Sequence, residues 1–250
     1  MKNFKTEYLL HLADNALILS HRLGEWCGHA PILEQDIALT NITLDILGQA
    51  RYFYQYAAKS DNKGKSEDYY AFFRNERDFK NLLILEQPNG DWAQTMLRQF
   101  LYDNYCLLLY QSLTECSDNQ IAAIASKAVK EVKYHYKFSS EWVMRLGDGT
   151  EESKKRLENA LENLWIYTGE MFEITPYETE MIKLGIAPDP SKLKHKWLEN
   201  TQNIFKLSNL SIPKTEWFQK GGKTGYHTEN LGKILTDLQY MQRSYPNCNW

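Results

Sequence analysis

The 250-residue sequence lacks the features of secreted and membrane-spanning proteins. Its four cysteines form neither a C-x-x-C pair nor a zinc-finger spacing, which favours reduced thiols in a cytosolic protein. No apolar run approaches the ~18–20 residues that a membrane span requires. The apolar segment over residues 9–21 is interrupted by His11, Asp14 and Asn15, so it does not qualify as a secretory signal. We therefore expect a soluble, cytoplasmic protein.

The sequence also lacks the patterns of nucleic-acid-binding, β-rich and nucleotide-binding proteins. A net charge of -3 at pH 7 gives no electrostatic reason to expect nucleic acid or an anionic membrane as a partner. No segment alternates as a β-strand does, and we find no internal repeat or low-complexity tract. The loop GGKTG (221–225) has Trp217 where a phosphate-binding loop needs its first glycine. We interpret it as an ordered loop whose Lys220, Lys223 and His227 are candidates to touch a partner.

Helical periodicity fills most of the chain. Gly28 and Pro31 separate the first two long helices, and Asp91 and Asp118 or Asn119 are the expected N-caps of the next two. The expected long helices cover residues 5–28, 33–59, 92–114 and 120–146. Shorter helices are expected within 69–87, from Thr150, around 178–184 and 191–207, and from about Thr228, where Leu231, Leu235, Leu238 and Met241 share one face.

Two pairs of long helices predict an all-α fold with the architecture of a ferritin-like antiparallel four-helix bundle. The core bundle is expected over residues 5–147 and additional C-terminal helices, with one long loop, over residues 150–250. One domain over residues 1–250 is the better interpretation of this length, which buries roughly 70–75% of the unfolded surface. Sixteen tyrosines and seven tryptophans fit either a protein partner or a tyrosine-rich core.

The expected helix over residues 33–59 combines two patterns. Four large apolar residues are expected to supply its apolar contacts: Leu33, Ile37, Leu44 and Leu47. Four polar residues share a second stripe at helical spacing: Asn41, Asp45, Gln49 and Tyr52. A polar stripe inside a helical protein is a functional site, the remains of one, or a buried hydrogen-bond network.

A carboxylate and histidine metal site is the most specific of these possibilities. Di-iron bundles place a glutamate on each of two helices and a Glu-x-x-His motif on each of the other two. This chain offers five residues of suitable type on its long helices but no Glu-x-x-His anywhere; the five are Glu25, Asp45, Asp103, Glu131 and His135. A half-satisfied polar core would cost several kcal/mol unless its members hydrogen-bond to one another. The residues alone therefore disfavour a working di-metal site.

Five blocks of the sequence together resemble one family closely: residues 21–34, 36–58, 82–100, 130–150 and 221–232. It is the C-subunit family of the multicomponent phenylacetyl-CoA epoxidase (ring 1,2-monooxygenase) of aerobic phenylacetate degradation, and the likeness covers nearly the whole chain. The resemblance implies a ferritin-like fold and a stable pairing with the homologous catalytic di-iron A subunit. In that complex dioxygen is activated and the aromatic ring is oxidised on the A subunit, a flavin and iron–sulfur reductase delivers electrons from NADPH, and the C subunit is structural.

The resemblance to the catalytic relative also implies which ligand positions remain. Glu25, Asp103 and His135 match ligand positions, whereas Ile46, Gln49 and Val132 stand where the other three ligands are expected. Asp45 and Glu131 lie one residue away from lost glutamates, which rotates each by about 100° around its helix. We therefore expect a relict site with no metal and no catalytic residues in this chain.

The leading hypothesis is a non-catalytic subunit that stabilises and positions a homologous di-iron oxygenase subunit. We expect such a component to have no active site or cofactor of its own. It would form a hetero-oligomer, contact the reductase only indirectly, and be able to self-associate. Trp26, Tyr52 and Tyr56 are candidate contributors to the shared interface. Two alternatives stay open. One is a di-metal oxygenase with a rearranged site that uses Asp45 and Glu131, and the other is an unrelated helical adaptor.

Overall fold

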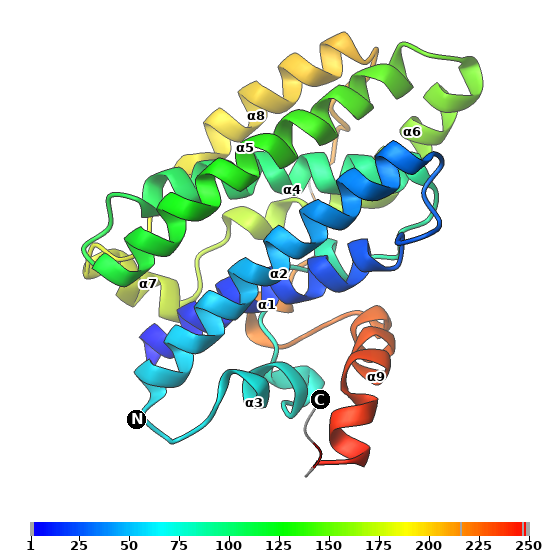
Figure 1. The fold of residues 1–250 in the computed structure, drawn as a ribbon. Helices are drawn as coiled ribbons and strands as arrows, with labels where there is room; N and C mark the ends of the chain where they lie inside the picture. The colour runs from blue at the N-terminus through cyan, green and yellow to red at the C-terminus, as the bar shows by residue number, and fades with distance from the viewer. Residues whose placement is uncertain (1–2, 216, 247, 249–250) are drawn as a thin grey trace. The chain divides into compact units, whose positions relative to one another are not determined.

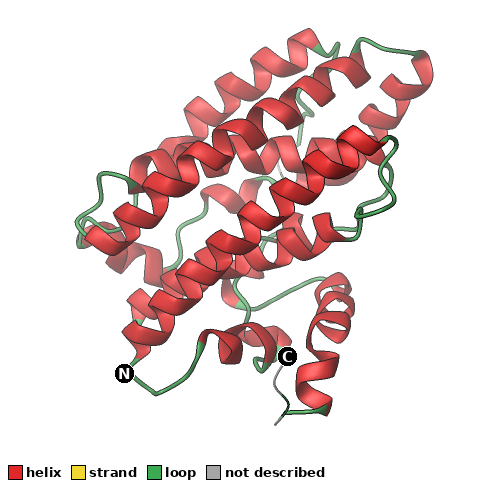
Figure 2. Ribbon diagram, in the orientation of Figure 1, coloured by secondary structure: helices red, strands yellow, loops and turns green. Residues whose placement is uncertain are grey.

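The computed structural model describes residues 3–215, 217–246 and 248, and its regular structure within these ranges is entirely helical (Figures 1 and 2). The all-α prediction is confirmed. No helix in these ranges combines the length and apolarity needed to cross a membrane. The α-helices are α1 (Phe4–Gly24), α2 (Leu33–Asp61), α3 (Glu67–Phe72), α4 (Trp92–Leu113), α5 (Asn119–Gly147), α6 (Glu151–Leu164), α7 (Pro176–Lys183), α8 (Pro190–Leu207) and α9 (Glu229–Ser244). Short 3-10 helices are η1 (Glu76–Asp78), η2 (Leu83–Glu86), η3 (Trp165–Tyr167), η4 (Gly169–Phe172) and η5 (Gly222–Thr224).

The chain folds as two compact units, each built on one pair of long antiparallel helices. Unit 1 comprises Met1–Pro88, Thr175–Met181 and Gly221–Trp250, and its long pair is α1 and α2. Unit 2 comprises Asn89–Ile174 and Ile182–Lys220, and its long pair is α4 and α5. Both predicted pairs are therefore present. A single domain over residues 1–250 stays a prediction.

The corner between α1 and α2 is set by a glycine and a carboxylate. Helix α1 ends at Gly24 rather than at the predicted residue 28, and a series of turns follows. Gly28 has a φ of 81°, a conformation that glycine adopts without the steric cost of a Cβ. The Asp36 carboxylate accepts hydrogen bonds from the backbone N–H groups of Gly28 (2.8 Å) and Ala30 (3.3 Å), which ties the corner to the first turn of α2.

Helix α1 is buried around nearly its whole circumference. Its neighbours within unit 1 include α2, α3, α9 and η2, which enclose it on several sides. Polar residues are enclosed along with the apolar ones: His11, Asp14 and Asn15 are all buried. A helix that is enclosed in this way must find internal partners for its polar side chains, because an unpaired buried polar group costs ~1–3 kcal/mol.

Helix α2 corrects one prediction. Its buried stripe follows the 3.6-residue period and comprises Leu39, Ile42, Ile46, Gln49, Ala50, Phe53, Tyr54 and Ala57. The four residues predicted to supply its apolar contacts are instead exposed: Leu33 by 71%, Ile37 by 53%, Leu44 by 60% and Leu47 by 44%. The helix carries apolar side chains on two faces, and periodicity alone does not say which face is covered.

Three helices of unit 2, α4, α5 and α6, begin at the residues that the sequence predicted. Asp91 accepts a hydrogen bond from the Gln94 backbone N–H at the start of α4 (3.0 Å). Asp118 does the same for Gln120 at α5, and Thr150 for Ser153 at α6. These side chains satisfy N–H groups that have no partner inside the helix, which explains why the starts of these helices were predictable.

Helix α8 packs on the α4–α5 pair through buried polar contacts as well as rings. The Trp197 indole donates to the Leu101 backbone carbonyl (2.9 Å), and the Asn104 amide donates to the Thr201 hydroxyl (3.1 Å). All of these side chains are buried. Each contact joins a residue of α4 to a residue more than 90 positions further along the chain.

Helix α9 starts as predicted, since Thr228 is its N-cap, but its predicted face is partly wrong. The buried residues are Leu231, Ile234, Leu235 and Gln239, whereas Leu238 is half-buried and Met241 is exposed. The first two residues of the predicted face are therefore buried, whereas the last two lie at or beyond the edge of the buried stripe.

A close approach in unit 2 predicts the effect of Gly147→Ala. A Cβ at Gly147 would lie 2.1 Å from the Ser208 backbone oxygen, so the ends of α5 and α8 would have to separate. We expect a loss of about 1–3 kcal/mol in the free energy of unfolding, measured by urea denaturation. Gly48→Ala is the control, because a Cβ at Gly48 meets nothing within 4 Å. It should be neutral or stabilise α2 by up to about 1 kcal/mol, and equal effects of the two changes would contradict this packing.

Candidate functional site

The predicted ligand positions divide between the two units, and each group is described by itself. Glu25, Ile46 and Gln49 belong to unit 1. The Glu25 side chain is 38% exposed and forms an ion pair with Arg22 (2.8 Å). Partial burial opposes ionisation of Glu25, but hydrogen bonds from His21 and Arg22 lower the pKa of its carboxyl. Ile46 and Gln49 are buried on α2, so the position of one lost ligand is filled by a hydrocarbon side chain.

Asp103, Val132 and His135 belong to unit 2, and all three are buried. Ser139 links two of them, because its hydroxyl lies 2.8 Å from the Asp103 carboxylate and 3.0 Å from the His135 backbone oxygen. The Gln99 amide donates a second hydrogen bond to Asp103 (2.7 Å). Asp103 is therefore engaged at both carboxylate oxygens by uncharged partners. Val132 contributes only hydrocarbon at a position where the resemblance predicts a ligand glutamate.

The environment of Asp103 favours its neutral form. Burial raises the pKa of the Asp103 carboxyl to about 8, although the hydrogen bonds from Ser139 and Gln99 act in the opposite direction. A di-iron ligand must be a carboxylate anion, since a protonated carboxyl competes poorly for a cation. The local chemistry of Asp103 therefore fits a buried hydrogen-bonding group better than a metal ligand.

The polar stripe of α2 does not form one surface inside the protein. Gln49 is buried, Asp45 is half-buried, and Asn41 and Tyr52 are exposed. Among the residues that the structure describes, no group of three or more His, Cys, Asp or Glu side chains is arranged to hold a metal ion. The residues present do not fit a di-iron centre, and the relict character of the six positions stays a prediction.

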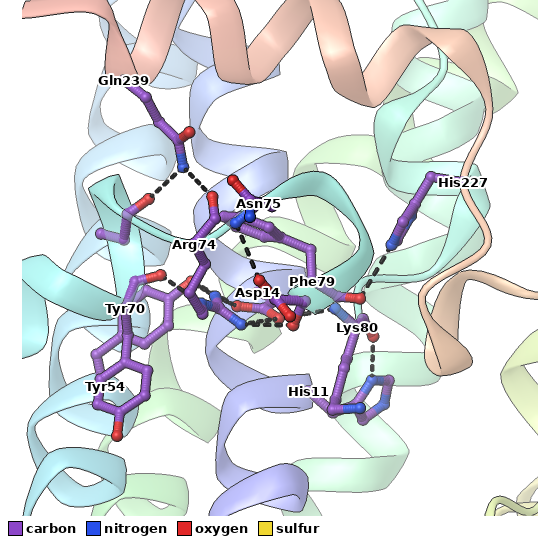
Figure 3. Close-up of polar contacts among 12 residues, drawn as sticks. His11, Asp14, Tyr54, Tyr70, Arg74, Asn75, Phe79, Lys80, His227 and Gln239 are labelled. Carbon is purple, nitrogen blue, oxygen red and sulfur yellow. Dashed lines mark hydrogen bonds and ion pairs between the residues drawn. The ribbon is translucent and has the colours of Figure 1, made fainter. Parts of the chain in front are cut away.

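Unit 1 contains a buried charge cluster that the sequence did not reveal as a site (Figure 3). Asp14 of α1 lies at its centre and forms a two-pronged ion pair with Arg74. The Tyr54 hydroxyl (2.6 Å) and the Lys80 backbone N–H (2.8 Å) also donate to Asp14. Burial by itself would lower the pKa of Arg74, but the charge of Asp14 raises it above the ordinary arginine value. Arg74 therefore keeps its positive charge although it is buried.

His11 lies one turn before Asp14 and is buried in its neutral form. Burial, together with the positive charge of Lys223, lowers the pKa of His11 to about 4. Its Nδ1 lies 2.7 Å from the Lys80 backbone oxygen, so the proton of the neutral ring is on Nδ1 and is donated to that oxygen. Asp14 and His11 thus bind the backbone N–H and the backbone carbonyl of Lys80, in the segment that follows α3.

Two further buried pairs attach later segments of unit 1. His227 contacts the Glu86 carboxylate through Nδ1 (3.0 Å) and the Phe79 carbonyl through Nε2 (3.0 Å). Burial opposes protonation, but the hydrogen bond and charge of Glu86 raise the pKa of His227. Lys223 pairs with Glu178 (2.7 Å), and this charge lowers the pKa of Glu178 against the opposing effect of burial.

These pairs correct the interpretation of the loop around GGKTG. Lys223 and His227 were candidates to touch a partner, but both side chains are buried and paired inside unit 1. Only Lys220 of the three is exposed, and it pairs with the exposed carboxylate of Glu173. The pairs fix the loop in place, and their chemistry is structural because each carboxylate is neutralised by a neighbouring cation.

The signal for the charge cluster is visible in retrospect. His11, Asp14 and Asn15 interrupt the most apolar helix of the chain. A polar residue at a position enclosed on all sides needs a partner, so their presence indicates internal hydrogen bonding. Arg74, Glu178 and Lys223 give no comparable signal, because they lie in short segments where charged residues are ordinarily exposed.

The fold and these sites define an all-helical protein with two long helix pairs, and its described residues hold no cluster of metal-ligating side chains. The sequence model for "Phenylacetic acid catabolic protein" matches residues 2–250, so the chain belongs to this family. The all-helical structure is consistent with the ferritin-like bundle of the family.

Two relatives come from Escherichia coli (strain K12), and both are components of 1,2-phenylacetyl-CoA epoxidase. The chain is 46% identical over 248 residues to the C subunit of that epoxidase, a match that covers 99% of this chain and 100% of that protein. It is 22% identical over 195 residues to the A subunit of the same epoxidase, a match that covers 76% of this chain and 62% of that protein. The resemblance found in the sequence is confirmed.

The raised pKa of Asp103 predicts a stability that falls with pH. The folded state holds the proton up to about pH 8, whereas the unfolded carboxyl loses it near pH 4. The stabilising contribution is therefore complete below about pH 4 and is lost as the pH rises to about 8. Asp103→Asn removes the ionisation and keeps the shape. We expect it to reduce the fall in unfolding free energy between pH 5 and pH 8 by about 2–4 kcal/mol, measured by denaturant titration.

The control for this measurement is Asp237→Asn, because Asp237 is exposed on α9. The control variant should keep the pH dependence of the wild type. If the stability of the wild type rose between pH 5 and pH 8, and that of Asp103→Asn rose to the same extent, the result would contradict a neutral Asp103.

The buried pair of Lys223 and Glu178 predicts a large effect of Lys223→Met. Removing the cation leaves the buried Glu178 carboxylate without its charge partner, which typically costs about 3–5 kcal/mol. Lys220→Met, three residues earlier, removes the same charge from an exposed pair and should change stability by less than about 1 kcal/mol. Thermal and urea unfolding of both variants give the comparison, and a similar cost for both would show that Lys223 is not a structural cation.

Proposed function

We propose that this chain is a non-catalytic subunit of a phenylacetyl-CoA epoxidase complex in phenylacetate catabolism, working in the cytoplasm. The observation that carries the proposal is the 46% identity to the C subunit of such an epoxidase over 99% of the chain. Identity at this level along the full length of both proteins supports the same place in a complex.

The ligand positions support a non-catalytic role. Ile46 and Val132 are buried hydrocarbon side chains and offer no donor atom to a metal. Gln49 offers an amide in place of an imidazole, and amides are weak ligands for iron. Asp103, the carboxylate carried over in unit 2, is held near neutrality by its surroundings. Together these residues favour a chain that holds no di-iron cofactor of its own.

The proposed partner is a homologous A subunit that carries the di-iron centre. The Escherichia coli proteins similar to this chain are the C and A subunits of one epoxidase, so the two kinds of chain belong to the same enzyme there. Two helical bundles of one family can share a large apolar interface, as obligate partners do. This chain would stabilise and position the catalytic subunit, and the reductase would act on the complex through that subunit.

The test is a co-purification of this chain with its homologous A subunit, with iron counted per chain and turnover of phenylacetyl-CoA measured. We expect a stable complex, iron only on the A subunit, and oxidation of the substrate only when both chains and a reductase are present. Stoichiometric iron on this chain, lost after Asp45→Ala or Glu131→Ala, would instead support an oxygenase with its own rearranged site. Full turnover by the isolated A subunit would exclude the structural role.

A structural His135 predicts the outcome of His135→Ala. The side chain is fully buried on α5, so its removal leaves a cavity and should cost about 2–4 kcal/mol of stability. The amount of iron per A subunit in the purified complex should not change. His195→Ala, at an exposed histidine of α8, is the control and should leave both stability and assembly unchanged. Loss of iron from this chain after His135→Ala would contradict the proposal.

A further inference from the structure

Helix α2 presents an apolar face to the outside of unit 1. We call Leu33, Ile37, Leu44 and Leu47 the α2 apolar face. These residues recur at helical spacing over four turns, and each side chain is at least 44% exposed. Between residues 33 and 50 the only exposed charged residue is Glu34. A helix with water on this side would normally carry charged side chains there.

Helix α5 provides a comparison within the same chain, because both helices have 29 residues. Its exposed residues include a series of cations: Lys127, Lys130, Lys133, Lys137 and Arg145. The charged face of α5 is the ordinary composition of a solvated helix. The composition of this side of α2 therefore suits contact with another apolar surface, whereas that of the exposed side of α5 suits contact with water.

The α2 apolar face continues into a groove within unit 1. A pocket of about 540 Å³ lies beside Leu44 and Leu47, and its other apolar walls include Leu17, Ala71 and Phe72. These residues come from α1, α2 and α3. The ion pair between Arg51 and Glu67 (3.2 Å) lies at its polar side. An apolar floor with a polar rim is the usual composition of a protein interface.

The size of this surface fits the centre of a protein–protein interface. Four large side chains that are about half exposed present ~400 Å² of apolar area, which is comparable to the largest apolar patch on a typical monomeric protein, and such patches are often functional. A standard interface buries ~800 Å² per partner, with an apolar centre inside a more polar rim. The α2 apolar face and the groove supply such a centre.

We propose that the α2 apolar face and its groove bind one helix of the homologous A subunit. The inference rests on the proposed function for the partner and adds the surface that it uses. The partner belongs to a family of helical proteins, and the side-chain ridge of a helix fits a groove between two helices. The composition of the face requires an apolar partner, because a charged one would be desolvated without compensation.

The test places a charge on the face and measures binding of the full-length A subunit to the full-length chain. Leu44→Glu should weaken binding by at least tenfold, because the carboxylate would be buried against apolar side chains. Leu207→Glu is the matched control, since Leu207 on α8 is 61% exposed and Leu44 is 60% exposed. The control should bind within twofold of the wild type. Ile37→Glu, at the other end of the face, is a second variant with the same expected loss.

The isolated variants distinguish the remaining outcomes. Each isolated variant should melt within a degree or two of the wild type. A clear fall in the melting temperature of both Leu44→Glu and Ile37→Glu would mean that other parts of the same chain cover this face, which would overturn the proposal. Unchanged binding by both variants overturns the proposed surface while the partnership stands. Absence of binding by the wild type overturns the proposed function instead. A wild-type self-association that Leu44→Glu abolishes, with binding to the catalytic partner intact, would assign the face to a second copy and overturn the proposal.

Discussion

The pairing of buried charges organises unit 1. Asp14, Glu86 and Glu178 are each enclosed, and each pairs with a basic side chain: Arg74, His227 and Lys223 respectively. The partners lie 60, 141 and 45 residues apart along the chain. Since an unpaired buried charge is far more costly than a paired one, α1, the segment after α3, the start of α7 and the loop before α9 have to assemble together. This requirement explains how segments that are remote in sequence form one compact unit.

The two long helix pairs carry similar lengths of helix but different surfaces. Helix α1 is enclosed, and α2 covers it with one face while presenting leucine and isoleucine on another. In unit 2, α5 covers α4 with an apolar stripe and presents lysines outward. An apolar outer face adds nothing to the stability of an isolated chain and increases its tendency to associate. Its presence is understandable in a protein that works within a larger assembly.

Hydrocarbon and neutral hydrogen bonds occupy several of the positions where the resemblance predicts metal ligands. Ile46 and Val132 are buried hydrocarbon side chains, which pack without requiring a charge partner. The Asp103 carboxyl accepts hydrogen bonds from Ser139 and Gln99. Its raised pKa allows the side chain to stay buried as a neutral group.

The sequence by itself determined the helices, their caps and the family. Asp91, Asp118, Thr150 and Thr228 mark helix starts through contacts two or three residues away, and such local contacts follow from residue types alone. Only the tertiary structure decided which face of α2 is covered and where Arg74, Lys223 and His227 find their partners. Helical periodicity identifies an apolar stripe but not the surface opposite it. Ion pairs between residues 45 to 141 positions apart depend on the folded arrangement of the whole unit and leave no local pattern in the chain.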